Sequence, residues 1–177
     1  MSWIQAANPT APITTEAEAQ AAARSSAIAI VIGVVYGLIG IAITFATMGT
    51  IKAAAVAQAG ANGGPANTGA IAETAVSIGV WVGIAFVVIQ AVLAVMQWRN
   101  PNKVIAIMFL LLIALGVAST LASVVLLNSG ALPQTSVATP IWQVVLAVIV
   151  MAVEAVLHFA GLRGMRRLDA IQMEAAR

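Results

Sequence analysis

Four long runs of apolar residues divide the chain into spans that are separated by short polar segments. The runs cover about residues 26–50, 71–97, 104–127 and 141–162. The hydrocarbon core of a bilayer is about 30 Å thick, and an α-helix of roughly 20 apolar residues crosses it. Each run is long enough, so the pattern predicts an all-α, polytopic membrane protein built as a bundle of four transmembrane helices.

The polar segments predict how the spans are connected. In the N-terminal tail, residues 1–25, Thr15 and Glu18 fit a capping box that would start a helical lead-in continuous with the first span. Upstream of Thr15 the tail is either ordered or frayed. The glycine-rich segment 61–69 predicts a loop. The short turn at 98–103 predicts that the second and third spans form an antiparallel hairpin, and residues 163–177 predict a basic amphipathic tail helix on the membrane surface.

Composition strengthens the membrane assignment and removes several kinds of chemistry. The chain is 62% hydrophobic and only 8% charged, whereas soluble domains carry about 25% charged residues. It has no cysteine and one histidine, which excludes disulfides, thiolate metal sites and covalent haem attachment. We therefore expect no metal and no cofactor. The net charge of +2 is too small to indicate a nucleic-acid partner.

Basic residues predict the orientation of the chain. With four spans, all but one of those that flank the spans fall on one side, and positively charged flanks remain cytoplasmic. We expect both termini in the cytoplasm and the protein in the cell membrane, the inner membrane if the source is bacterial. The exception is Lys52. The residues expected to fix topology or contact lipid headgroups are Arg99, Lys103, Arg163, Arg166 and Arg167, and Arg24 falls on their side.

The fourth span carries the only acid and the only histidine in the apolar interior of any span, Glu154 and His158. At 100° per residue, polar and small residues form one stripe on this span and a second stripe on residues 71–97. Small residues allow close helix packing, and polar ones hydrogen-bond between helices. The candidate polar site comprises Glu154, His158, Gln90, Gln143 and Gln97. The candidate packing residues are Gly33, Gly37, Gly79, Gly83, Ala147 and Gly161.

A weak internal similarity indicates two related hairpins in tandem. A shift of 64 residues places QAVLAVMQWR, from Gln90, over EAVLHFAGLR, from Glu154. Such runs of alanine, valine and leucine also align by chance, so duplication remains one of two alternatives.

Two functions fit these features. No catalytic motif is present, so we expect a non-enzymatic accessory or scaffold subunit that packs in the bilayer with itself or with a larger complex. In that case Glu154 would bond to Gln90, Tyr36 or Thr44, and His158 would lie near the headgroups. The alternative is a small oligomeric transporter or channel that uses Glu154 and His158 as a protonatable site, the default hypothesis for an intramembrane acid.

Overall fold

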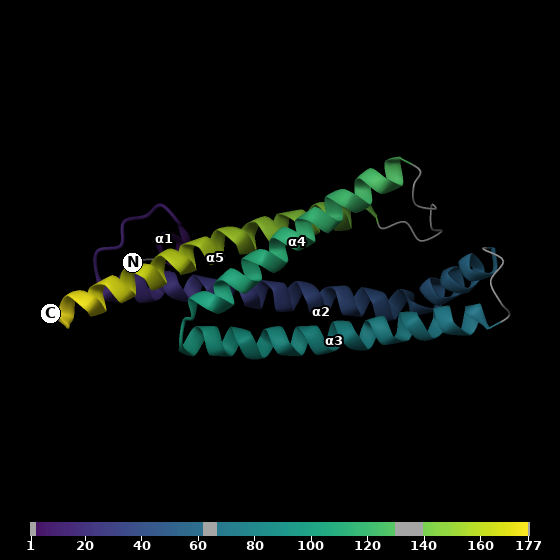
Figure 1. The fold of residues 1–177 in the computed structure, drawn as a ribbon, viewed down its shortest axis with the longest axis horizontal. Helices are drawn as coiled ribbons and strands as arrows, with labels where there is room; N and C mark the ends of the chain where they lie inside the picture. Colours follow the sequence, from purple (N-terminus) through teal and green to yellow (C-terminus); the bar gives the residue numbers. More distant parts are fainter. Residues whose placement is uncertain (1–2, 62–66, 130–139, 177) are drawn as a thin grey trace.

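The computed structural model describes residues 3–61, 67–129 and 140–176, and this part of the chain is helical without strands. Most of the predicted loop at 61–69 lies outside the described residues. The helices are α1 (Trp3–Ala7), α2 (Glu16–Ala61), α3 (Thr68–Arg99), α4 (Lys103–Asn128) and α5 (Ile141–Ala175) (Figure 1). Four of them, α2 to α5, are long and apolar enough to cross a membrane. The chain is therefore an all-α, multi-pass membrane bundle.

Helix α2 joins the predicted lead-in to the first span without a break. Its 46 residues extend for about 69 Å at 1.5 Å per residue, more than twice the thickness of a bilayer core. The helix starts at the predicted capping box: the backbone N–H of Glu18 donates to Oγ1 of Thr15 at 3.3 Å, and the N–H of Thr15 donates to Oε2 of Glu18 at 3.2 Å.

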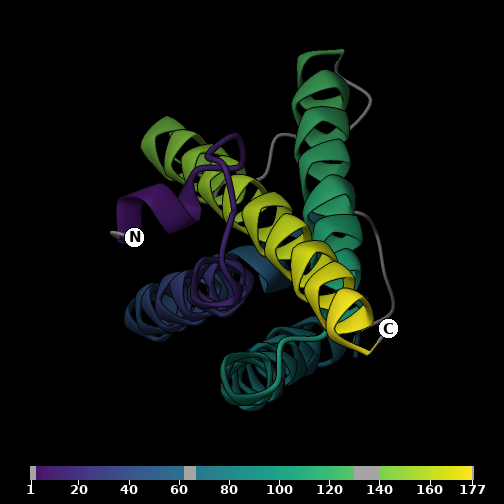
Figure 2. The ribbon, with the colours of Figure 1, turned by 90° about the vertical axis from the view of Figure 1, so that its left-hand side faces the viewer.

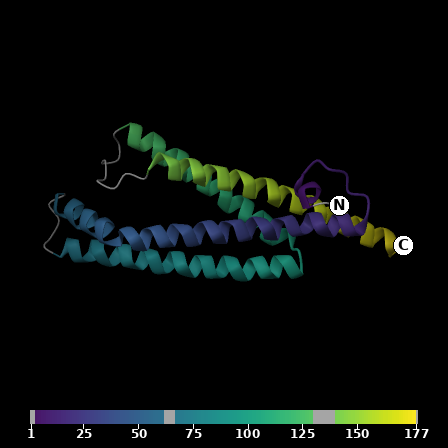
Figure 3. The same cartoon turned by 180° about the vertical axis from the view of Figure 1, so that it is seen from behind.

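The four long helices pack as two pairs. Helix α2 contacts α3, α4 contacts α5, and contacts between α2 and α5 hold the two pairs together. Figure 3 shows the α2/α3 pair beneath the α4/α5 pair. Both described ends of the chain and the turn between α3 and α4 lie at one end of the bundle, which we call the terminal end (Figure 1). The opposite end is the far end.

The predicted hairpin of the second and third spans is antiparallel, but its helices diverge instead of packing along their length. Figure 2, an end-on view, shows α4 leaving α3 and crossing beside α5. The turn itself is anchored by Gln97, which is fully buried and accepts a hydrogen bond from the backbone N–H of Asn102 at 2.9 Å. A short turn fixes the direction of the next helix, whereas side-chain packing selects its neighbour. Here Ala106 and Phe109 are buried on the side of α4 that faces α5.

The tightest packing lies at the terminal end, where α2 crosses α5. A Cβ placed on Gly164 would lie 2.3 Å from the backbone nitrogen of Ala23, and one on Gly161 would lie 2.6 Å from the Cβ of Ser26. Only glycine permits such an approach. Around this crossing α2 buries a row of alanines and serines: Ala19, Ala22, Ala23, Ser25, Ser26, Ala27 and Ala29.

Two predictions about the tails need correction or completion. Residues 163–175 do not form a separate surface helix, because α5 continues through them and their apolar side packs on protein: Met165 is buried with Ala23, and Leu168 packs on the same cluster. Residues 3–14 are ordered. Helix α1 packs on α2 and α5, and the guanidinium of Arg163 donates to backbone carbonyls of Pro9 and Ala11.

Candidate functional site

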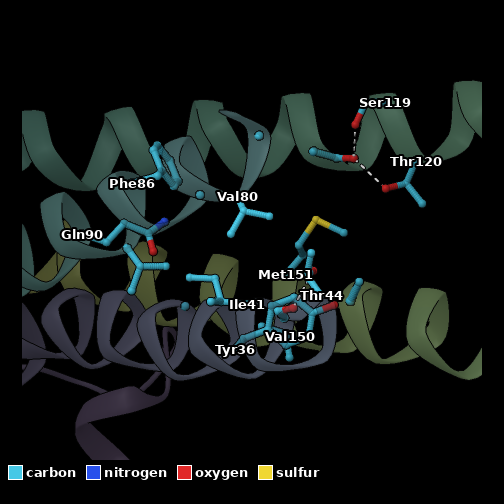
Figure 4. Close-up of a pocket in the computed structure, with 18 of the residues that line it drawn as sticks. Tyr36, Ile41, Thr44, Val80, Phe86, Gln90, Ser119, Thr120, Val150 and Met151 are labelled. Atoms are coloured by element: carbon cyan, nitrogen blue, oxygen red, sulfur yellow. Dashed lines mark hydrogen bonds between the residues drawn. The ribbon is translucent and has the colours of Figure 1, made fainter. Parts of the chain in front are cut away.

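A cavity of about 640 Å³ lies between the two helix pairs. All four long helices line it, and Figure 4 shows the side chains that surround it. Most of its wall is apolar or glycine. Its lining residues with polar side chains are Tyr36 and Thr44 of α2, Gln90 of α3, Ser119 and Thr120 of α4, and Glu154 of α5.

Glu154 points across the bundle toward α2. A Cβ placed on Gly33 would lie 2.9 Å from Oε1 of Glu154 and 3.9 Å from Oε1 of Gln90. The glycine therefore makes room for the carboxyl group, and the carboxamide of Gln90 lies near the same position. Within the described part of the chain, Glu154 has neither a hydrogen bond nor an ion pair. It is the acidic residue of the cavity, and among the described residues it has no partner there.

The hydroxyl groups of the cavity are mostly committed to their own helices. Oγ1 of Thr44 donates to the carbonyl of Gly40 at 2.8 Å. Ser119 and Thr120 both donate to the carbonyl of Gly116, each at 2.9 Å (Figure 4). Such bonds satisfy the donor without reaching a neighbouring helix. The sequence-based expectation that Glu154 would bond to Gln90, Tyr36 or Thr44 is therefore wrong in this structure.

The cavity is open on one side and closed at the terminal end. Phe86 of α3 and Ser119 of α4 line it and are themselves exposed, so the opening lies between the diverging helices α3 and α4. Toward the terminal end, next to Gln90 and Glu154, the path is blocked by a cluster of Ile30, Ala94 and Phe109, which are at most 6% exposed.

His158 forms part of this blocked end and does not line the cavity. Its side chain is fully buried; Nδ1 lies 2.8 Å from Oγ of Ser26, and the ring stacks on Phe109 with 5.5 Å between centroids. Nε2 has no hydrogen-bond partner among the residues that the structure describes. The ring is enclosed by α2 and α4, whereas its depth relative to the headgroups stays a prediction. His158, on α5, thus contacts α2 and α4 one turn from Glu154 toward the terminal end.

The other predicted polar residues lie apart from Glu154. Gln97 belongs to the α3–α4 turn, where its Nε2 also lies 3.9 Å from Sδ of Met165. Gln143 is near the start of α5, eleven residues before Glu154 and about 16 Å away along the axis. Of the five predicted polar residues, only Glu154 and Gln90 meet in the cavity.

The predicted packing residues divide into two groups. Gly33 and Gly37 of α2 accommodate side chains of neighbouring helices: a Cβ on Gly37 would lie 2.7 Å from Val87. Gly161 packs against Ser26, as described above. Gly79 and Gly83 pack on no described residue, since a Cβ on either would have none of their atoms within 4 Å. These two glycines and Ala147 line the cavity instead, because α4 moves away from α3 at their level.

The predicted topology residues all lie at the terminal end, and several bind protein groups there. Lys103 pairs with Asp169, Arg163 holds the N-terminal segment, and Arg167 lies 3.7 Å from Glu174. Arg99 and Arg166 are exposed. At the far end Lys52 pairs with Glu73 at 3.3 Å, which links α2 to α3.

Sequence reasoning missed four residues that shape this region: Ser26, Phe109, Gly116 and Gly164. Gly164 follows Gly161 on the same side of α5, so its spacing could have revealed it. Ser26 and Phe109 are ordinary residues of apolar runs, and nothing in the sequence pairs them with His158.

Comparison of the chain with protein-family models, with curated proteins and with solved structures finds no match. Among the described residues, no three His, Asp or Glu side chains come together as a metal site would require.

Proposed function

We propose that this protein is a small membrane transporter that binds its substrate inside the bilayer, in the cavity between the two helix pairs. The observation that carries the proposal is the unpartnered carboxyl group of Glu154 in a cavity of about 640 Å³. A charged side chain in hydrocarbon costs at least about 2.5 kcal/mol. A protein that places a carboxyl group in the membrane without a partner in its own chain is suited to binding a ligand that supplies the partner.

The shape of the cavity supports transport over simple packing. Its volume falls within the range of about 300–1,000 Å³ that is usual for small-molecule sites. It is open between α3 and α4 and blocked at the terminal end by the cluster of Ile30, Ala94 and Phe109. A carrier that opens to one side at a time needs a site of this kind near mid-membrane, closed on one side.

A second candidate function is an accessory or scaffold subunit, which works as a homo-oligomer or within a larger complex. Gly79 and Gly83 favour it, because they form a small-residue face on α3 with nothing packed on it. Faces of this type accept a helix of another chain at close range. In that case a partner helix would occupy the opening between α3 and α4.

For either function we propose that the terminal end faces the cytoplasm, with the protein in the cell membrane. Arg24, Arg99, Lys103 and the arginines of α5 after residue 162 gather at that end, whereas Lys52 is at the other. Positively charged flanks are retained on the cytoplasmic side during insertion.

The molecules that remain bound to the protein after purification in mild detergent distinguish the two functions. We would purify the wild type and Gly83→Leu, whose new side chain points into the cavity, and identify bound molecules by native mass spectrometry. The matched control is Gly49→Leu, since a Cβ at Gly49 also has nothing within 4 Å but residue 49 does not line the cavity.

A small molecule that is bound by the wild type and by Gly49→Leu, and lost from Gly83→Leu, supports the transporter. A protein partner lost in the same way supports the accessory subunit instead. Retention of the same small molecule by all three would place it outside the cavity and contradict the proposed site.

A further inference from the structure

The charges around the cavity restrict what it can bind. Its lining includes Glu154 and neither lysine nor arginine. Outside the lining, the nearest ionisable group on the same helix is His158, and its ring is enclosed on the terminal side. An anionic ligand would place a second negative charge beside an uncompensated carboxylate in a medium of low dielectric constant, which is strongly unfavourable. A cationic ligand would compensate Glu154.

The polar groups next to Glu154 are too few for a metal ion. Near Gly33 the lining supplies one carboxylate and one carboxamide oxygen, from Glu154 and Gln90, and its other polar side chains are the single hydroxyls of Tyr36, Thr44, Ser119 and Thr120. Calcium takes about six to eight oxygen ligands, and magnesium prefers six in an octahedron. One carboxylate and one carboxamide suit a cation that needs only one or two hydrogen bonds, or none.

The remaining wall suits a bulky apolar body. Two aromatic rings line the cavity, Tyr36 from α2 and Phe86 from α3, and they attract a diffuse positive charge through their faces. Gly79 and Gly83 leave space where side chains would otherwise stand. The opening between α3 and α4 faces the lipid, the region in which an amphiphilic cation accumulates.

From these three observations we propose that the ligand is an organic monocation with a large apolar body, an amphiphile that enters from the lipid between α3 and α4. Its charge pairs with the carboxylate of Glu154 beside Gln90, and its body fills the space in front of Gly79 and Gly83. The inference rests on the proposed function, because it assigns a chemical class to the substrate of that same cavity.

The test uses two probes of the same shape, tetraphenylphosphonium and the neutral tetraphenylsilane. Binding of each to the full-length protein in mild detergent is measured by equilibrium dialysis. The variants are Glu154→Gln, which removes the charge and keeps the shape, and Gly83→Leu, which fills the cavity. Their controls are Glu73→Gln, at an exposed acid of the far end, and Gly49→Leu.

We expect saturable binding of the cation by the wild type, weakened at least about tenfold in Glu154→Gln and in Gly83→Leu, and unchanged in both controls. Protons should compete with the probe, so that its affinity falls toward acidic pH in the wild type and not in Glu154→Gln. Equal affinity of the wild type and Glu154→Gln for the cation would overturn the inference.

The neutral probe separates this inference from the proposed function. If tetraphenylsilane binds as tightly as the cation, and Gly83→Leu abolishes both, the cavity is a ligand site without charge selectivity; the inference falls and the proposed function stands. If neither probe distinguishes Gly83→Leu from Gly49→Leu, the cavity is not a site for such ligands, and both are contradicted.

Discussion

Glu154 and His158 lie one turn apart on α5, yet they have different surroundings. At residue 158 the close crossing of α2 and α5 brings Ser26 against the imidazole, and Phe109 covers its face. One turn toward the far end, Gly33 has no side chain to cover the carboxyl group of Glu154, which therefore faces the cavity. The sequence places both residues on one stripe. It does not reveal at which level neighbouring helices separate, and this level decides which residue is enclosed.

Outside the membrane, Glu18 gives a prediction that depends on pH. It lies eight residues before the predicted first span, and its Oε2 accepts hydrogen bonds from the backbone N–H of Thr14, the hydroxyl of Thr14 and the backbone N–H of Thr15. These bonds favour the carboxylate and lower the pKa of Glu18 from 4.5 to about 2.

Because the folded-state pKa lies below the ordinary value, the carboxylate stabilises the first turn of α2 fully above about pH 4.5, and this contribution is lost as pH falls toward 2. Amide hydrogen exchange in residues 18–21 should therefore accelerate across this interval, relative to the intrinsic exchange rate. In Glu18→Gln the acceleration should be absent. The matched variant Glu16→Gln, in the same turn, should behave as the wild type; if it also loses the pH dependence, the effect does not arise at Glu18.

At the scale of helices, the crossing of α2 and α5 depends on the absence of a side chain at Gly164. A Cβ there would lie 2.3 Å from a backbone nitrogen, and a backbone cannot move aside as a side chain can. We expect Gly164→Ala to lower the free energy of unfolding by about 1–3 kcal/mol, measured by titration with denaturing detergent and circular dichroism.

The control for this prediction is Gly49→Ala, in the second half of α2. Its Cβ meets open space, and alanine favours a helix over glycine by roughly 0.5–1 kcal/mol, so this variant should be as stable as the wild type or slightly more so. An equally stable Gly164→Ala would show that α2 and α5 are not this close.

The sequence predicts the helices better than it predicts their neighbours. Apolar runs bounded by polar segments indicate four spans, and Thr15 with Glu18 marks the start of α2. Two features could not be found in this way. The sequence after residue 162 has the pattern of a surface helix. That its apolar side is covered follows only from the structure, in which Met165 and Leu168 pack against Ala23 and Ala106. Likewise, a three-residue turn specifies antiparallel direction but not whether α3 and α4 remain in contact.

For the whole molecule, the main feature is that α2 packs as extensively on α5 as on α3, whereas α4 contacts α5 and diverges from α3. Duplication of the two hairpins stays a prediction. The predicted stripes of α3 and α5 do turn inward, and Gly79, Gly83, Gln90, Ala147 and Glu154 all line the cavity. The stripes do not predict that they face a cavity instead of each other. The cavity depends on the path of α4, which the sequence does not show.

The most direct test of this account is a chemical one, the reaction of Glu154 with dicyclohexylcarbodiimide in membranes. This lipid-soluble reagent adds to a protonated carboxyl group to give an O-acylisourea, which rearranges in apolar surroundings to a stable N-acylurea. An unpartnered carboxyl group in a cavity that opens to lipid should react. Four of the other five acidic residues lie outside the predicted spans, and the fifth, Glu73, lies at the start of the second span, where it pairs with Lys52.

Peptide mass spectrometry should locate the adduct at Glu154 in the wild type, with slower modification in Gly83→Leu and an unchanged rate in Gly49→Leu. An excess of tetraphenylphosphonium should protect the residue. A wild-type protein whose Glu154 remains unmodified, or is modified at the same rate in Gly83→Leu, would contradict the account, because the carboxyl group would then not lie in an open cavity.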